Sequence, residues 1–265
     1  MPVADARTQR SIGALMERAL IADPSQAGAK LVAGLLRNVC PCQIWAGQDA
    51  ARVMELAQLT EPHVIFIDHG MAIDGIALTR QIRRSDLGCR KAPVIMLSGL
   101  ATAAAILGAR DAGVHEFLRK PFTIRDLVRR LSAVAERPRD WVEAIGYVGP
   151  DRRRFNSGDY AGPLKRRVDY AVTPDEARVE QALRIMRAAL LAIEADPRQA
   201  LRALIAQTDE LATSVRARSD MPFRAAAVSL NQGLQAMRPG TLTRAAVEPL
   251  ANRILAFHPQ DSAAA

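Results

Sequence analysis

The stretch VIFIDHGMAIDG, residues 64–75, joins four consecutive apolar residues directly to Asp68. An unbroken apolar run of this length, bounded by polar residues, is typical of a strand that is buried on both faces. An aspartate at the end of such a strand commonly caps the following turn. The same position in a parallel sheet is also where ligands bind, so the other strands decide which role fits Asp68.

Short apolar runs alternate with amphipathic stretches on both sides of this segment. They predict strands at 18–23, 42–47, 63–68, 92–98 and 115–120, and helices at 25–39, 49–59, 75–85, 102–113 and 123–137. In the first of these helices, Leu31, Leu35 and Leu36 are expected to share the buried face. Five strand–helix units with mostly continuous apolar strands predict an α/β domain over residues 16–137. Its core is expected to be a doubly wound, five-stranded parallel sheet.

Polar side chains follow four of the predicted strands. Asp23, Asp68, Ser98 and Lys120 each stand at the carboxyl end of a different strand. Because the carboxyl ends of parallel strands meet at one edge of the sheet, two carboxylates, a hydroxyl and an ammonium are expected to lie close together. A single aspartate in this place is most often a cap, but four equivalent positions favour a binding or catalytic site.

Residues 138–173 mix proline, glycine, charge and isolated aromatic residues without periodicity, which predicts a basic linker with little regular structure. The run Arg152–Arg154 is either a phosphate-binding patch or part of a solvated linker. The second interpretation is favoured because no other motif residues accompany the run. Residues 1–15 are interpreted as an N-terminal extension and residues 259–265 as a disordered tail.

Residues 174–258 are predicted to form a separate all-α bundle of four helices that serves as an interaction domain. The segment opens with Thr173-Pro174-Asp175-Glu176, an N-cap followed by proline and two acids in the first turn. An apolar seam then repeats at four-three spacing, through Val179, Leu183, Met186, Leu190 and Ile193. The seam fits the core of a bundle better than a dimer interface.

Charge and cysteine content narrow the class of protein. The chain of 265 residues has a net charge of +8, and we count a net charge of +1 over residues 174–265. DNA binding needs several unpaired basic side chains, so DNA is a less favoured partner of the helical segment. Three cysteines are too few for a disulfide framework. With no recognisable leader and no apolar run of membrane-spanning length, a soluble cytoplasmic protein without membrane contact is expected.

The ordered set of motifs resembles the receiver domains of two-component response regulators, which have a CheY-like fold. The resemblance covers residues 16–137, about half the chain. It is carried by Asp23, by DHGMAIDG at 68–75, by Ser98 and by DAGVHEFLRKPF at 111–122. It implies that Asp68 accepts a phosphoryl group from a histidine kinase or a histidine phosphotransfer protein. Lys120 and Ser98 would then contact the phosphoryl oxygens, and Phe117 would be the aromatic residue whose position follows Ser98.

The resemblance also implies a Mg²⁺ site formed by Asp23, Asp68 and the backbone carbonyl of Gly70. This sequence departs from the family pattern, because Pro24 stands where a second acidic residue usually follows Asp23. With one carboxylate fewer, Mg²⁺ is expected to bind more weakly.

The leading functional hypothesis is a phosphorylation switch whose helical output binds an unknown protein or a second copy of itself. One alternative is a DNA-binding transcriptional response regulator. Another is a phosphorylation-independent pseudo-receiver that acts as a scaffold. No constellation for an enzymatic output is recognised, so the chain is not expected to be an enzyme beyond phosphoryl transfer and autodephosphorylation at its own receiver.

Overall fold

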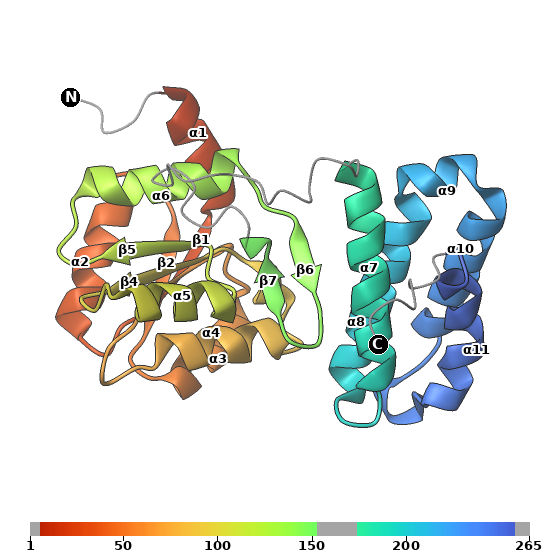
Figure 1. Ribbon diagram of the computed structural model, residues 1–265. Coiled ribbons are helices and arrows are strands. Elements are labelled where there is room, and N and C mark those ends of the chain that lie inside the picture. Colours follow the sequence, from red (N-terminus) through yellow and green to blue (C-terminus); the bar gives the residue numbers. More distant parts are fainter. Residues whose placement is uncertain (1–5, 153–173, 258–265) are drawn as a thin grey trace. The chain divides into compact units, whose positions relative to one another are not determined.

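In the computed structural model, which describes residues 6–152 and 174–257, five parallel strands form one sheet in the order β2-β1-β3-β4-β5 (Figure 1). The strands are β1 (Arg18–Ala22), β2 (Gln43–Gly47), β3 (Val64–Asp68), β4 (Val94–Ser98) and β5 (Glu116–Arg119). All four strand pairings are parallel. The sheet and the strand positions predicted from the apolar runs are therefore confirmed to within about two residues.

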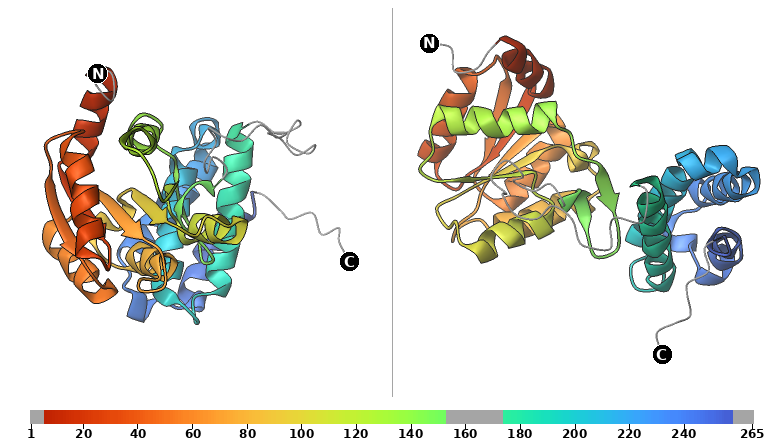
Figure 2. Two further views of the ribbon diagram at one scale, coloured as in Figure 1. Left: turned by 90° about the vertical axis from the view of Figure 1, so that its left-hand side faces the viewer. Right: turned by 45° about the horizontal axis from the view of Figure 1, so that its top comes forward.

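Helices cover both faces of this sheet, as Figures 1 and 2 show. The first face packs against α1 (Ala6–Leu15), α2 (Gln26–Arg37) and α6 (Ile124–Glu136). The second packs against α3 (Ala50–Thr60), α4 (Gly75–Arg84) and α5 (Ala103–Ala112), and a short 3-10 helix, η1 (Gly88–Lys91), precedes β4. Successive residues of each strand alternate between two apolar clusters, which explains why the strands read as continuous apolar runs.

The buried face of α2 confirms Leu36 of the three predicted leucines, with Leu35 partly buried, but not Leu31. Leu31 is 65% exposed, whereas the buried residues are Ala29, Val32, Ala33 and Leu36. These four residues follow the spacing of one helix face, and the two alanines let the helix approach the sheet closely. The prediction for Leu31 was wrong because the two alanines, which it did not include, share the buried face with Val32 and Leu36.

The prediction of an irregular linker after residue 137 is wrong for its described part. Strands β6 (Trp141–Glu143) and β7 (Val148–Pro150) form a two-stranded sheet. A Cβ at Gly113, which has φ of +93°, would lie only 2.6 Å from the Val148 carbonyl oxygen, so β7 packs directly on the end of α5. Strands of three residues are too short to produce a periodic signal. The rest of the predicted linker, residues 153–173, lies outside the described residues.

Arg152 is the one arginine of the run 152–154 that the structure describes, and it is not simply solvated. Its Nη1 lies 3.0 Å from Oδ1 of Asp111, and its guanidinium carbon lies 4.4 Å from the centre of the Tyr147 ring. The first arginine of the run is thus bound to the α/β unit.

The described residues divide into two compact units, and the boundary falls within the hairpin. Residues 6–142 and 147–152 belong to the α/β unit, whereas residues 143–146 belong to the helical unit together with 174–257. Within the helical unit, Glu143 is buried and accepts a hydrogen bond of 3.0 Å from Nε2 of Gln199. The carbonyl oxygen of Glu143 also accepts from Gln207.

Over residues 174–257, the helical unit contains five α-helices rather than the predicted four. They are α7 (Pro174–Leu191), α8 (Pro197–Thr213), α9 (Val215–Ser219), α10 (Met221–Gln235) and α11 (Arg244–Leu255), with a 3-10 turn, η3 (Pro239–Thr241), before α11. The second of the four predicted helices, expected over residues 198–217, is interrupted because Ser214 is extended. The Ser214 hydroxyl accepts a hydrogen bond from the Ala217 amide. All five residues of the predicted apolar seam are buried in the core of this unit. The predicted disordered tail lies outside the described residues.

Candidate receiver site

The carboxyl ends of β1, β3, β4 and β5 bring together the residues that the sequence singled out. Asp68 ends β3 and Ser98 ends β4, while Asp23 and Lys120 directly follow β1 and β5. The chain order reverses between β1 and β3, which places Asp23 and Asp68 at the switch point of the doubly wound sheet. The Lys120 amide donates a hydrogen bond of 2.8 Å to the Ser98 carbonyl oxygen, which aligns the carboxyl ends of β4 and β5.

Lys120 joins the two carboxylates. Its Nζ lies 2.5 Å from Oδ1 of Asp68 and 3.7 Å from Oδ2 of Asp23. The Asp23 side chain is 2% exposed and the Asp68 side chain 16%, whereas the Lys120 side chain is 34% exposed. Asp23 is therefore buried beneath the site, whereas Asp68 and Lys120 are partly exposed to solvent.

Asp23 has one satisfied and one unsatisfied oxygen. Oδ1 accepts a hydrogen bond of 2.8 Å from the Ser25 amide, whereas Oδ2 is buried and accepts no hydrogen bond from any described residue. A buried carboxylate oxygen without a donor is costly unless a cation satisfies it. Lys120 at 3.7 Å satisfies it only in part, so the donor set suits an additional hard cation such as Mg²⁺.

Gly28 is a residue of this site that the sequence did not indicate. A Cβ at Gly28 would lie 2.5 Å from Oδ2 of Asp23, too close for the carboxylate to stay in place. Gly28 lies in the first turn of α2, whose start is capped by the hydroxyl of Ser25. The glycine thus lets the helix end approach the carboxylate, a contact that only tertiary structure reveals.

Ser98 is buried and its hydroxyl is fully engaged. Oγ donates a hydrogen bond of 2.8 Å to the carbonyl oxygen of His69 and accepts one of 3.0 Å from the Leu100 amide. The Ser98 hydroxyl is thereby tied to the residue that follows Asp68, but within the described residues it makes no hydrogen bond to the Lys120 ammonium or to either carboxylate. To reach a group on Asp68, its hydroxyl has to release the His69 carbonyl.

The Asp74-Gly75 pair at the end of the opening stretch has a structural role. Oδ1 of Asp74 accepts hydrogen bonds of 3.0 Å from the amides of Ile76 and Ala77, so Asp74 caps α4. The Gly70 amide donates to the Ile73 carbonyl across the same loop, and Nδ1 of His69 accepts from the Gly75 amide. These bonds fix the backbone between Asp68 and α4.

Phe117 lies inside the protein, only 4% exposed, in the apolar cluster between the sheet and α3, α4 and α5. It is paired with Met96 across β4 and β5. Since Ser98 is bonded to the His69 carbonyl in the same structure, the inward position of Phe117 does not require Ser98 to have moved.

The absence of a second acidic residue after Asp23 limits the number of side chains that could hold a metal ion. Within residues 6–152 and 174–257, no three His, Cys, Asp or Glu side chains cluster so as to hold a metal ion. Pro24 directly follows Asp23, which leaves Asp23 and Asp68 as the acids of the site.

Across the same described ranges, no helix is both long and apolar enough to cross a membrane.

Comparison with known proteins agrees with this geometry. A family model described as the response regulator receiver domain matches residues 19–132. Transcriptional regulatory protein PdtaR of Mycobacterium tuberculosis is 30% identical over 145 residues, which are 54% of this chain and 69% of PdtaR. This chain belongs to the response regulator family.

Two other known proteins match less than half of this chain. Protein PetR of Rhodobacter capsulatus is 29% identical over 125 residues, which cover 44% of this chain and 51% of PetR. The chemotaxis protein CheY4 of Vibrio cholerae has a solved structure with 22% identity and a TM-score of 0.42, covering 45% of this chain and 98% of its own. The match of the receiver model ends at residue 132, so the helical unit lies outside it.

Proposed function

We propose that this response regulator accepts a phosphoryl group on Asp68 from a histidine kinase or a histidine phosphotransfer protein. The observation that carries the proposal is the contact of Lys120 with Asp68, at 2.5 Å, beside the buried Asp23. A nucleophilic carboxylate, a point cation and a second acid at one edge of the sheet are the parts that phosphoryl transfer needs, since its catalysis rests on positioning and charge.

In the proposed reaction, a carboxylate oxygen of Asp68 attacks the phosphorus of a phosphohistidine. A P–O bond forms, the P–N bond breaks, and the electron pair leaves with the imidazole of the donor protein. Lys120 offsets the charge of the incoming group. Ser98 exchanges its hydrogen bond with the His69 carbonyl for one to a phosphoryl oxygen.

Mg²⁺ is the cofactor that the donor set fits, with Asp23, Asp68 and the carbonyl of Gly70 as the proposed ligands. When bound, the ion offsets the negative charge that builds up between the carboxylate and the phosphoryl group. Pro24 removes one anionic ligand, so a larger share of the coordination falls to water and the affinity is low.

The helical unit is the proposed output, and a protein partner or a second copy of the chain is its proposed target in the cytoplasm. A DNA-directed output is the second candidate, because the relatives PdtaR and PrrA are named transcriptional regulatory proteins. The net charge of +1 over residues 174–265 favours the protein partner. We propose no enzymatic activity beyond chemistry at the receiver itself.

Beryllofluoride, which mimics an acyl phosphate, tests this switch. The full chain is measured by light scattering after size exclusion, with Mg²⁺ and with or without beryllofluoride, and binding to DNA is measured in parallel. We expect a Mg²⁺-dependent change in oligomeric state that is absent in Asp68→Asn. A chain that responds in neither assay would instead support the scaffold alternative, a receiver that works without phosphorylation.

A further inference from the structure

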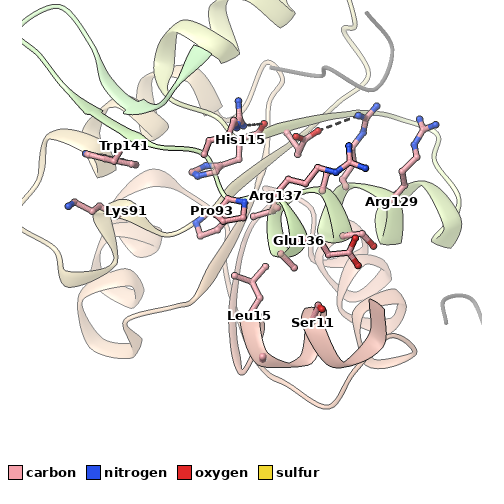
Figure 3. A pocket seen from close by; sticks show the side chains of 18 residues that line it. Ser11, Leu15, Lys91, Pro93, His115, Arg129, Glu136, Arg137 and Trp141 are labelled. Atoms are coloured by element: carbon pink, nitrogen blue, oxygen red, sulfur yellow. Dashed lines mark hydrogen bonds and ion pairs between the residues drawn. The ribbon is translucent and has the colours of Figure 1, made fainter. Parts of the chain in front are cut away.

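A cavity of about 1220 Å³ opens in the α/β unit at the end of the sheet opposite Asp68 (Figure 3). It lies at the amino ends of β4 and β5, where Pro93 and His115 directly precede the two strands. The last turns of α6 and one side of α1 complete its walls. Binding sites for small molecules usually have volumes of roughly 300–1000 Å³, so the space is ample for a ligand.

Most of the cavity is built by segments that the receiver match does not include. Eleven of its eighteen lining residues lie outside residues 19–132, three of them in α1 and eight after residue 132. The receiver fold therefore contributes the floor, whereas α1, the end of α6 and the start of β6 add the walls. The cavity is consequently a feature of this chain, separate from the site around Asp68.

Positive charge dominates the lining. Five basic side chains, Lys91, Arg129, Arg130, Arg137 and Arg139, face two acidic ones, Glu116 and Glu136. Glu116 is already paired with Arg130, at 3.3 Å, and Glu136 accepts a hydrogen bond from Thr8. By contrast, the described residues provide no hydrogen bond or ion pair for the guanidinium groups of Arg129 and Arg137. Two exposed arginines in one basic cavity suit a ligand that carries several negative charges.

The other end of the cavity is aromatic. Figure 3 shows Lys91 and Trp141 at one end and Arg129 at the other. Nζ of Lys91 lies 5.9 Å from the centre of the Trp141 ring, close enough for a cation–π contact. The guanidinium carbons of Arg83 and Arg90 also lie 5.2 Å and 5.9 Å from this ring centre. A heterocycle that stacks on the half-buried indole would therefore take the place of the exposed Lys91 ammonium, and base–aromatic stacking contributes about 1–3 kcal/mol per base.

We propose that this cavity binds a nucleotide, with its phosphates at Arg129 and Arg137 and its base beside Trp141. Arginine matches phosphate geometry through paired N–H donors, and Trp141 supplies the flat apolar contact. The inference goes beyond the phosphorylation of Asp68 and does not depend on it.

The test uses the full chain with Trp45→Phe, which leaves Trp141 as its only tryptophan because the sequence contains two. ATP, inorganic pyrophosphate and adenosine are titrated separately in the presence of a metal chelator, with Trp141 fluorescence and calorimetry as readouts. We expect saturable binding of ATP, weaker binding of pyrophosphate, and the same ATP affinity in Asp68→Asn.

Charge variants assign the binding to the cavity. Arg129→Gln and Arg137→Gln are each expected to weaken ATP binding roughly tenfold, as the loss of one charged hydrogen bond does. Glu136→Gln is expected to tighten it. Arg125→Gln is the matched control, because Arg125 is an exposed arginine of the same helix that does not line the cavity. Circular dichroism checks that each variant is folded.

Three results would overturn the proposal: no saturable ATP binding by the folded chain, ATP binding that survives the double substitution of Arg129 and Arg137, or pyrophosphate binding as tightly as ATP. Either of the first two results would show that Arg129 and Arg137 do not bind the phosphates. The third would show that Trp141 does not contact the base. Because Asp68→Asn is measured in parallel, failure here is distinguishable from failure of the phosphorylation switch.

Discussion

Nζ of Lys120 lies 2.5 Å from Oδ1 of Asp68, so the residue proposed to receive the phosphoryl group already has its charge partner in place. In Lys120→Met this cation is lost, and the two carboxylates face the incoming phosphoryl group without it. We expect the rate of phosphorylation by acetyl phosphate to fall by roughly 100-fold or more, the usual cost of removing one preorganised charge contact. The rate is measured by mass spectrometry of the intact protein.

Lys30→Met is the control for this measurement, because Lys30 is an exposed lysine on α2 with no contact to the site. Equal rates for Lys120→Met and Lys30→Met would show that the contact of Lys120 with Asp68 plays no part in phosphoryl transfer.

Two glycines of α2 provide a matched test of the packing against Asp23. Gly34 has open space around a Cβ, whereas a Cβ at Gly28 would lie 2.5 Å from Oδ2 of Asp23. Gly34→Ala is expected to stabilise the receiver by about 1 kcal/mol through helix propensity alone. Gly28→Ala is expected to lack this gain and to weaken Mg²⁺ binding several-fold. Thermal unfolding and calorimetric Mg²⁺ titration measure the two effects, and identical behaviour of the two variants would contradict the proposed role of Gly28.

The missing acid can be restored at Pro24. In Pro24→Asp a second carboxylate follows Asp23, and we expect Mg²⁺ to bind roughly tenfold more tightly, because affinity for hard cations rises with the number of anionic ligands. Pro24→Asn, which adds no charge, is the control. Calorimetric titration with Mg²⁺ and with Ca²⁺ measures the change. An unchanged affinity in Pro24→Asp would mean that position 24 is not oriented toward the cation.

His115 makes the stability of the receiver depend on pH. Its Nδ1 lies 3.2 Å from both Nη2 of Arg83 and the Val94 amide, and both are donors, so this nitrogen accepts and the ring is neutral. Burial, reinforced by the positive charges of Arg83 and Arg139, holds the pKa of His115 well below 6.5.

The unfolded chain therefore binds a proton at pH values where the folded chain does not. The stabilisation is complete above the unfolded pKa of about 6.5 and is lost below it, by about 1.4 kcal/mol per pH unit until the folded pKa is reached. Both tryptophans, Trp45 and Trp141, lie in the α/β unit. Their fluorescence during denaturant unfolding therefore measures the free energy of unfolding of this unit. His115→Gln should remove this part of the pH dependence, and an unchanged slope in the variant would assign it to other groups.

The sequence predicted the sheet and the meeting of Asp23, Asp68 and Lys120, because buried parallel strands need continuous apolar runs and their ends lie at one edge. It did not predict the closeness of Gly28 to Asp23 or the inward position of Phe117. Both depend on how side chains from distant segments pack, and no local pattern records such contacts. The hairpin of β6 and β7 was missed for a related reason, since its three-residue strands are held by partners such as Gly113.

The most direct test of the phosphorylation switch locates the phosphoryl group chemically. The full chain is incubated with acetyl phosphate and Mg²⁺ and then treated with borohydride, which reduces an acyl phosphate on aspartate to homoserine, and the peptides are sequenced by mass spectrometry. We predict homoserine at position 68, dependent on Mg²⁺ and on Lys120. Homoserine at another aspartate, or at none while the protein remains folded, would contradict the assignment of Asp68 as the phosphoacceptor.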